Sequence, residues 1–436
     1  MAADNHKPKR IKAPFIACSL FFTLIFLIIF ITCRTYHFIG PYPLEELKSL
    51  SYVSWIPLEE RKGSSSDIKA GVVKYDRNKT SDGINIYASI ARREVYLMDM
   101  AGGILHRWSI RTEEEGDLQH VRLCGNGDLL AIIQMKSLMR VGWDSGIKWR
   151  KKIRAHHDIF IDKQNDIYCL TAKDEIVFLY GLPVPVLNDY ITIISEDGEI
   201  KREISMFALL KDRISFETVG EIYSWICKPK TLTDILKRKT EYPFTNDTPP
   251  DIFHVNTVQA IDQDIEGFAR KGDLLICVRS MDLICVVDLS RNKIIWECGP
   301  GELDRPHYPT LLKDGNILIF DNGYGRGWSR IVKLDPSAKK IIWEYKGNPD
   351  EKFFTRVRGG LQGLDNGNML ITESERGRSF EMTKDNEIVW EFYNPEIDRD
   401  NNKRAVIHRM ARVADIEGYP KLKALLSAAT AKPISK

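Results

Sequence analysis

Short apolar runs and turn residues alternate along the chain from about residue 71 onward. In one recurring unit, an Asn-Gly, Asp-Gly or similar polar pair precedes a run of apolar residues. Such pairs supply the positive φ angles that tight hairpins need, so each copy predicts a turn followed by a β-strand. The copies are "GNGDLLAII" from Gly125, "QNDIYCLTA" from Gln164, "KGDLLICVR" from Lys271, "DGNILIFDNG" from Asp314 and "NGNMLITES" from Asn366.

A second unit combines a turn carrying Asp, or a substitute for it, with a strand that often ends in Trp. Successive copies lie about 45 to 50 residues apart, with one doubled gap, which is the period of a four-stranded blade. Six copies predict an all-β fold, a six-bladed β-propeller over residues 71–400; a β-sandwich is the alternative, and the regular period disfavours it. The copies are "DMAGGILHRW" from Asp99, "DSGIKW" from Asp144, "SEDGEIKRE" from Ser195, "DLSRNKIIWE" from Asp288, "DPSAKKIIWE" from Asp335 and "TKDNEIVWE" from Thr383.

The doubled gap predicts a partly helical insertion over residues 206–250. Its stretch "TLTDILKRKTEYPF" has a helical pattern followed by loop residues, and long insertions in propellers usually lie at one rim. Residues 34–70 are expected to form a linker. Residues 401–436 are expected to form a C-terminal tail with a short amphipathic helix.

The N-terminus carries an uncharged apolar run from Ala13 to Thr32, long enough to cross a hydrocarbon core of ~30 Å as a helix. Basic residues are concentrated before the run, so the positive-inside rule predicts that residues 1–12 form a cytoplasmic tail. A cleaved signal peptide is the alternative, but the run is long for one and no small-x-small cleavage site follows it. We therefore expect a signal anchor at residues 13–33 and a single-pass membrane protein whose propeller is extracytoplasmic, in the periplasm or its equivalent.

Composition excludes some functions. The net charge of +3 and the charged fraction of 28% are balanced, so nucleic acid is not an expected partner. The eight cysteines contain no CxxC pair, and neither a metal site nor a cofactor is predicted. Cys277 and Cys285 flank an expected hairpin, and the sequence leaves open whether they form a disulfide or are buried thiols.

Three histidines, His157, His254 and His307, each come just before an apolar strand that begins a predicted blade. Because the first strand of a blade lies nearest the axis, we expect these side chains to converge at one end of the central channel. Arg279 lies on the next strand of the same blade as His254, which predicts a cationic pocket for an oxyanion. Two alternatives are a three-histidine metal site, which the arginine disfavours, and histidines that are only hydrogen-bonded core residues.

The runs "DIFHVNTVQAI", "GDLLICVR", "WECGPGE", "SRIVKLDP" and "NGNMLITES" resemble the arylsulfotransferase family, the PAPS-independent aryl sulfate transferases built on a six-bladed propeller. The resemblance covers residues 72–395. It implies that His157 and His254 bind substrate, that Arg279 acts beside them, and that His307 is the nucleophile. We place His156, Asn256 and Asn322 next to these four as further substrate-binding residues.

The chain departs from that family at three places. The nucleophile stands in Pro306-His307-Tyr308-Pro309, Cys277 replaces the serine of a Ser-x-Arg element, and a membrane anchor replaces an N-terminal β-domain. The two prolines would restrict the backbone around His307. These differences leave open whether turnover is retained.

The resemblance implies sulfuryl transfer from an aryl sulfate to a phenol or alcohol through a sulfohistidine intermediate. The expected partners are these small molecules and the membrane, with a homodimer left open. Two alternatives from other classes are a non-catalytic, membrane-tethered scaffold or assembly factor, and a propeller that binds a quinone or metal in its channel.

Overall fold

The computed structural model describes residues 54–58, 68–226, 249–347, 352–414 and 416–430. The chain divides into two compact units. The larger unit comprises residues 51–175, 187–210 and 251–436, and the smaller comprises residues 1–50, 176–186 and 211–250.

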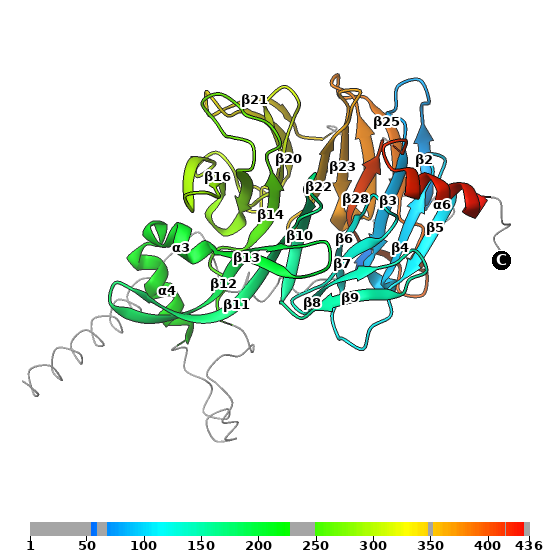
Figure 1. Ribbon diagram of the computed structural model, residues 1–436. Coiled ribbons are helices and arrows are strands. Elements are labelled where there is room, and N and C mark those ends of the chain that lie inside the picture. The colour runs from blue at the N-terminus through cyan, green and yellow to red at the C-terminus, as the bar shows by residue number, and fades with distance from the viewer. Residues whose placement is uncertain (1–53, 59–67, 227–248, 348–351, 415, 431–436) are drawn as a thin grey trace, which may run out of the picture. The chain divides into compact units, whose positions relative to one another are not determined.

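The larger unit is built from antiparallel sheets, as the repeat predicts (Figure 1). Three sheets follow the chain order. They are β6 (Leu118–Leu123), β7 (Leu129–Ile133), β8 (Ser137–Val141) and β9 (Ile147–Lys151); β14 (Val255–Ala260), β15 (Leu274–Val278), β16 (Leu283–Asp288) and β17 (Lys293–Cys298); and β18 (Pro306–Leu311), β19 (Ile317–Asp321), β20 (Arg330–Asp335) and β21 (Lys340–Tyr345).

A fourth sheet contains two strands of 13 residues, β11 and β12, whose far ends belong to the smaller unit. Its order is β10 (Ala155–Ile161), β11 (Ile167–Leu179), β12 (Leu182–Ile194) and β13 (Ile200–Ser205). Within the smaller unit, the Tyr180 hydroxyl donates to the Ile214 carbonyl (2.7 Å) and the Tyr180 ring meets Phe216 edge-on. The sequence did not predict this extension of the hairpin.

Two further sheets each combine strands from both ends of the described chain. β28 (Ile407–Val413) pairs with β3 (Ile84–Ser89), followed by β4 (Glu94–Met98) and β5 (Ile104–Ser109). β22 (Gly360–Gly363), β23 (Met369–Glu373), β24 (Arg378–Met382) and β25 (Ile388–Tyr393) are followed by β2 (Gly71–Tyr75). Figure 1 shows the blue β2 beside β25, and β28 beside the blue β3.

The terminal regions differ from the prediction. β28 lies inside residues 401–436, so the sheets extend beyond residue 400 and this region is not a tail. A small sheet of β1 (Trp55–Pro57), β27 (Lys403–Ala405) and β26 (Ile397–Asp398) also draws on the predicted linker. The expected C-terminal helix is present as α6 (Pro420–Thr430), which buries Leu422 in the core.

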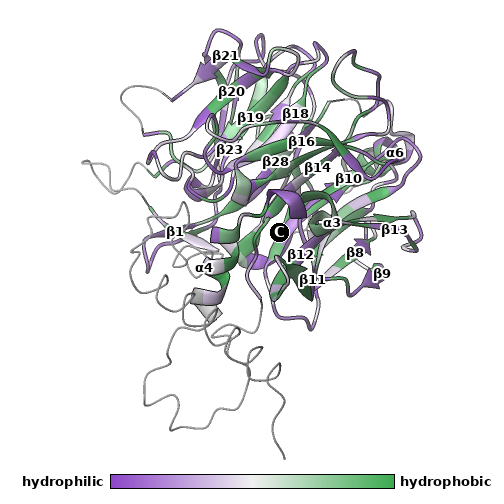
Figure 2. Ribbon diagram, turned by 90° about the vertical axis from the view of Figure 1, so that its left-hand side faces the viewer, coloured by the Kyte–Doolittle hydropathy of each residue, from purple (hydrophilic) through white to green (hydrophobic). Residues whose placement is uncertain are grey.

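The first strands of the six sheets contact one another in a closed order: β6, β10, β14, β18, β22, β28 and again β6. The fold is therefore all-β and propeller-like. Apolar strands packed between hydrophilic turns form the core (Figure 2). The repeated Trp ties neighbouring sheets together: the indole N–H groups of Trp149, Trp296 and Trp390 donate to backbone carbonyls in turns of the adjacent sheets.

The beginning of the predicted insertion is helical, with α3 (Met206–Leu210), η2 (Lys211–Arg213) and α4 (Phe216–Ile226). Three further 3-10 turns are η1 (Ile90–Arg92), η3 (Arg279–Met281) and η4 (Ser374–Arg376). The stretch at residues 231–244 and the predicted anchor at residues 13–33 lie outside the described residues. Among the helices that are described, none has the length and apolar character needed to cross a bilayer.

Candidate active site

The first strands are irregular where they begin, and the candidate residues lie at these irregularities. The pairing register shifts between His156 and Ile159 in β10, and between His307 and Thr310 in β18. Such bulges turn extra side chains away from the regular alternation and are common beside functional sites. Pro309 falls in the gap, where no ladder hydrogen bond requires its missing N–H.

The register corrects one detail of the prediction. His157 and His307 lie within their strands rather than before them, while His254 directly precedes β14. His156 and His307 are the last paired residues before the shift in their strands, so His156, rather than His157, corresponds to His307. His157 instead occupies the bulge, with a φ of 55°.

The tautomer of His307 follows from its hydrogen bonds. Nδ1 lies 2.7 Å from Oδ1 of Asn322 and 3.2 Å from the carbonyl oxygen of Arg305. The Asn322 amide is oriented by its Nδ2, which donates to the carbonyls of Thr355 and Arg358. Both groups facing Nδ1 are acceptors, so Nδ1 carries the proton and Nε2 keeps its lone pair.

Burial keeps this imidazole neutral. His307 is 4% exposed, and burial, the Arg279 guanidinium and His254 all lower its pKa well below the ordinary value. A neutral ring with a bare Nε2 is the form in which histidine acts as a nucleophile.

Arg279 and His254 come from one sheet and are joined through the backbone. The Arg279 N–H donates to the His254 carbonyl (3.2 Å), and both side chains are buried. Nδ1 of His254 lies 2.6 Å from Oδ2 of Asp251, whose Oδ1 accepts the His254 backbone N–H. Despite burial, which opposes it, His254 lowers the pKa of the Asp251 carboxyl, so this pair is a carboxylate that orients an imidazole.

His156 and His157 form a second buried pair. Their Nδ1 atoms are 2.8 Å apart, and Nε2 of His156 lies 3.2 Å from Oδ1 of Asp189, off the line of an ideal hydrogen bond. The His157 ring meets His254 edge-on, with centroids 4.6 Å apart. Burial and the neighbouring His254 lower the pKa of His157 well below its ordinary value.

The structure brings the four predicted catalytic residues close together. His254 and Arg279 are near enough to His307 to lower its pKa, and His254 and His307 are near enough to His157 to lower its pKa. It assigns different work to the three predicted substrate-binding residues. Asn322 holds His307, and His156 contacts His157. Asn256 uses its Nδ2 to donate to the Pro306 carbonyl (2.9 Å). Each of the three therefore contacts one of the predicted catalytic residues or its neighbour in sequence, and their predicted part in substrate binding stays a prediction.

Sequence reasoning missed several members of the cluster. His408 is 5% exposed, its pKa is lowered by burial and by Arg409, Arg358 and His307, and its Nδ1 has no hydrogen-bond partner among the described residues. His120 is buried beside it, with ring centroids 6.0 Å apart. His120 also lines the cavity that the first strands enclose on their other side, so the five histidines buried at this end of the first strands, which we call the histidine end, are His156, His157, His254, His307 and His408.

A layer of polar contacts lies next to the histidine end. The Arg409 guanidinium donates to Oδ1 of Asp158 (2.6 Å) and stacks 3.7 Å from the Tyr308 ring centroid. Oδ2 of Asp158 accepts the Val258 backbone N–H. Arg409, Asp158 and Tyr308 directly follow His408, His157 and His307 in sequence. Their contacts therefore join the strands that carry these histidines.

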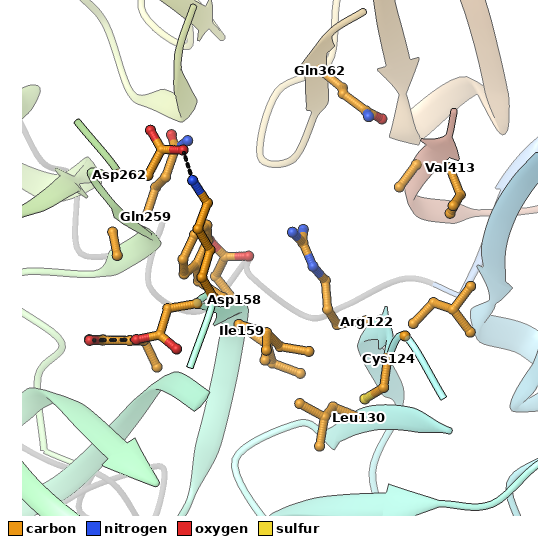
Figure 3. Close-up of a pocket in the computed structure, with 18 of the residues that line it drawn as sticks. Arg122, Cys124, Leu130, Asp158, Ile159, Gln259, Asp262, Gln362 and Val413 are labelled. Atoms are coloured by element: carbon orange, nitrogen blue, oxygen red, sulfur yellow. Dashed lines mark hydrogen bonds and ion pairs between the residues drawn. The ribbon is translucent and has the colours of Figure 1, made fainter. Parts of the chain in front are cut away.

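On the other side of this layer, the first strands enclose a cavity of about 1400 Å³, which we call the open end. Its lining includes Arg122, whose side chain points into the cavity, together with Asp262 and Gln362 (Figure 3). Lys163 forms an ion pair with Asp262 across two sheets (3.1 Å). None of the predicted site residues lines this cavity.

Cys277 and Cys285 are free thiols in the core, and the strand register pairs each of them with an isoleucine instead. Within the residues that the structure describes, no group of three or more His, Cys, Asp or Glu is arranged to hold a metal ion.

Comparisons with known proteins bear on the family. Among solved structures, a Bacteroides caccae protein of unknown function is 11% identical, with a TM-score of 0.49 over 77% of this chain and 100% of its own. A streptogramin B lyase is 13% identical (TM-score 0.43; 82% and 97% covered), and the Dos1 propeller is 8% identical (TM-score 0.38; 76% of each chain). No curated protein matches the chain.

The sequence profile of one family, Arylsulfotransferase (ASST), matches residues 140–395. The match covers more than half of the chain and includes His156, His157, His254, Arg279 and His307. The chain therefore belongs to the arylsulfotransferase family.

Proposed function

We propose that this protein transfers a sulfuryl group from an aryl sulfate to a phenol or alcohol, with His307 as the nucleophile. The observation that carries the proposal is the hydrogen bond between Nδ1 of His307 and Asn322, which leaves Nε2 free to attack next to the Arg279 guanidinium. Family membership supports sulfuryl transfer as the reaction class.

The first step forms a nitrogen–sulfur bond. The Nε2 lone pair of His307 attacks sulfur in line with the aryl oxygen, the sulfur–oxygen bond breaks, and the departing oxygen takes a proton from His254 or His157. Charge develops on the sulfuryl oxygens, and Arg279 stabilises it; a donor of this kind typically contributes a factor of about 10²–10³ in rate.

The second step reverses the first with a new alcohol. The acceptor hydroxyl loses its proton to the same imidazole, its oxygen attacks sulfur, and the nitrogen–sulfur bond breaks, which restores the Nε2 lone pair. Donor and acceptor occupy the site in turn, so the kinetics should be ping-pong.

We also propose that the six sheets are the blades of a six-bladed propeller, tethered by residues 13–33 with the blades outside the cytoplasm. The apolar run and the basic residues before it support this topology. Digestion of the sheets by protease is expected in cells whose outer envelope has been removed and whose cytoplasmic membrane is sealed; protection until the cytoplasmic membrane is opened would place them in the cytoplasm.

The substitution His307→Asn tests the nucleophile sharply. The Asn amide can keep the hydrogen bond that Nδ1 makes to Asn322, but it has no atom in the place of Nε2. We expect the full-length variant to fold as wild type does and to lose all turnover of 4-nitrophenyl sulfate. His106→Asn is the matched control, because His106 is half-buried against Trp143 in another part of the fold, and it should retain wild-type turnover.

Turnover by His307→Asn at more than a few per cent of the wild-type rate would remove His307 as the nucleophile. If wild type turns over no member of a panel of aryl sulfates, the proposed function itself fails.

A further inference from the structure

Three buried side chains form a line that ends at the histidine end. Asp189 meets Nε2 of His156 at 3.2 Å, and Nδ1 of His156 meets Nδ1 of His157 at 2.8 Å. The exposed fractions of the three residues are 1%, 3% and 9%. Asp189 is fixed in turn, because its Oδ2 accepts the Val255 backbone N–H (2.7 Å).

The short contact between the two Nδ1 atoms requires one proton between them, since one nitrogen must donate and the other must accept. Two arrangements satisfy it when Asp189 is ionised, Nε2 of His156 carries a proton toward it, and His157 is neutral. In the loaded arrangement, His156 is an imidazolium and His157 carries its proton on Nε2. In the unloaded arrangement, both rings are neutral and His157 donates from Nδ1, with its Nε2 bare.

The surrounding charges favour the loaded arrangement in the resting protein. Burial acts to lower the pKa of His156, but Asp189, with Asp251 nearby, raises it, and the backbone of Thr171 adds a hydrogen bond. Burial and Asp251 also raise the pKa of Asp189, while His156 and the Val255 N–H act to keep the carboxyl ionised. Burial lowers the pKa of His157 most strongly, and the neighbouring His254, His156, His408 and His307 act in the same direction.

We propose that Asp189, His156 and His157 form a proton relay that supplies the leaving aryl oxygen and recovers the same proton from the acceptor. This inference rests on the proposed sulfuryl transfer. It assigns proton delivery to His157 rather than His254, and it makes His156 and Asp189 positioning residues that store the proton.

The relay balances over one catalytic cycle. As the sulfur–oxygen bond breaks, the Nε2 proton of His157 moves to the aryl oxygen, and the Nδ1 proton of His156 moves to Nδ1 of His157. The rings are then unloaded. In the second step the acceptor hydroxyl gives its proton to Nε2 of His157, and Nδ1 of His157 returns its proton to His156. No proton is exchanged with solvent, which suits a buried site.

The leaving group provides the first test. Acid catalysis matters most for a poor leaving group, so Asp189→Asn should lower kcat/KM for phenyl sulfate by about 10²-fold and that for 4-nitrophenyl sulfate only a few-fold. Asn keeps an acceptor for the Val255 N–H but removes the charge that holds the proton. A role limited to structure would reduce both rates by one factor.

Asp128→Asn is the matched control. Asp128 is also buried (3% exposed) and accepts hydrogen bonds from Arg140 and Lys148, away from the histidine end. Asp128→Asn should leave the ratio of kcat/KM for phenyl sulfate to kcat/KM for 4-nitrophenyl sulfate unchanged. An unchanged ratio in Asp189→Asn would overturn the relay.

A second measurement does not depend on turnover. Nitrogen NMR of the full chain labelled in histidine, assigned with His156→Gln and His157→Gln, reads the protonation of each ring nitrogen. We expect an imidazolium at His156 and a neutral Nε2–H ring at His157, with His156 becoming neutral in Asp189→Asn. A neutral His156 in wild type would contradict the relay even if sulfuryl transfer is confirmed. If the expected signals appear but the protein turns over no aryl sulfate, the proton is stored on His156 as proposed and the proposed sulfuryl transfer fails.

Discussion

The two ends of the channel are lined by the same six strands, yet they treat charge in opposite ways. At the open end, charges are paired and exposed: Lys163 and Asp262 have side chains 71% and 61% exposed, and Lys313 pairs with an exposed Asp365. At the histidine end the charged side chains are buried: Arg279 and Arg358 are 2% and 4% exposed, and together with burial they lower the pKa values of His307 and His408. Electrostatic interactions are stronger in a buried site than at an exposed surface, so the contrast supports the histidine end as the place for the proposed anionic substrate.

The backbone explains why the two ends differ. At the histidine end the register shifts and the positive φ of His157 and Tyr308 take side chains out of the regular alternation. At the open end the first strands finish in ordinary turns, such as the one in which the Asp162 side chain accepts two backbone N–H groups. Among the described residues, only the irregular end brings five imidazoles together.

The largest expected effect separates the two ends directly. Arg279→Met removes the guanidinium next to His307 and should lower kcat for an aryl sulfate by about 10²–10³-fold. Arg122→Met, at the open end, should change kcat by less than about twofold, because Arg122 points into the cavity there and away from the histidine end. Equal losses in steady-state assays of the two variants would break the comparison.

A smaller loss is expected when the orientation of the nucleophile is relaxed. Asn322→Ala removes the acceptor from Asn322 for Nδ1 of His307, and it removes the hydrogen bonds that Nδ2 donates to the carbonyls of Thr355 and Arg358. We expect about a tenfold fall in kcat, and a fall of about 1–3 kcal/mol in the free energy of unfolding by urea. Wild-type kcat in this variant would show that Asn322 does not set the reactive tautomer.

Much of this arrangement could be predicted from sequence, and the reason lies in the repeat. Turn pairs and Trp-ended strands indicate the sheets, and the fold brings His157, His254, Arg279 and His307 together as expected. The roles of the neighbouring residues could not be predicted, because they depend on register. If the strand register were shifted by one residue, His156 would not contact the His157 imidazole and Asn322 would not accept the hydrogen bond from His307.

Other residues were missed because their segments gave no signal. His408 and Arg409 lie on β28, the strand that closes the ring from the far end of the chain, in a region expected to be a tail. Asp189 lies on the third strand of its sheet, and only its contact with His156 reveals its role.

The buried histidines should also be visible in the pH dependence of stability. Burial lowers the pKa of His408 from 6.5, so the unfolded chain binds a proton that the folded chain does not, and stability falls as the pH drops below 6.5. His408→Gln should reduce that slope by about 1.4 kcal/mol for each pH unit, measured by urea unfolding between neutral and mildly acidic pH. An unchanged slope would mean that His408 is protonated in the folded protein.

The smallest effect is expected at the open end. Lys313→Ala removes the exposed ion pair with Asp365 and should change the free energy of unfolding by less than about 1 kcal/mol, with no change in kcat. A loss of activity would show that the open end takes part in the reaction, and the contrast between the two ends would then need revision.

The central claim is that the histidine end carries the sulfuryl group on His307, and trapping the intermediate tests it most directly. Wild-type protein mixed with an aryl sulfate in the absence of acceptor, quenched in base and mapped by mass spectrometry, should carry one SO₃ group on the peptide that contains His307. His307→Asn should carry none. A sulfuryl group on any other residue, or steady release of phenol without a covalent adduct, would contradict the account.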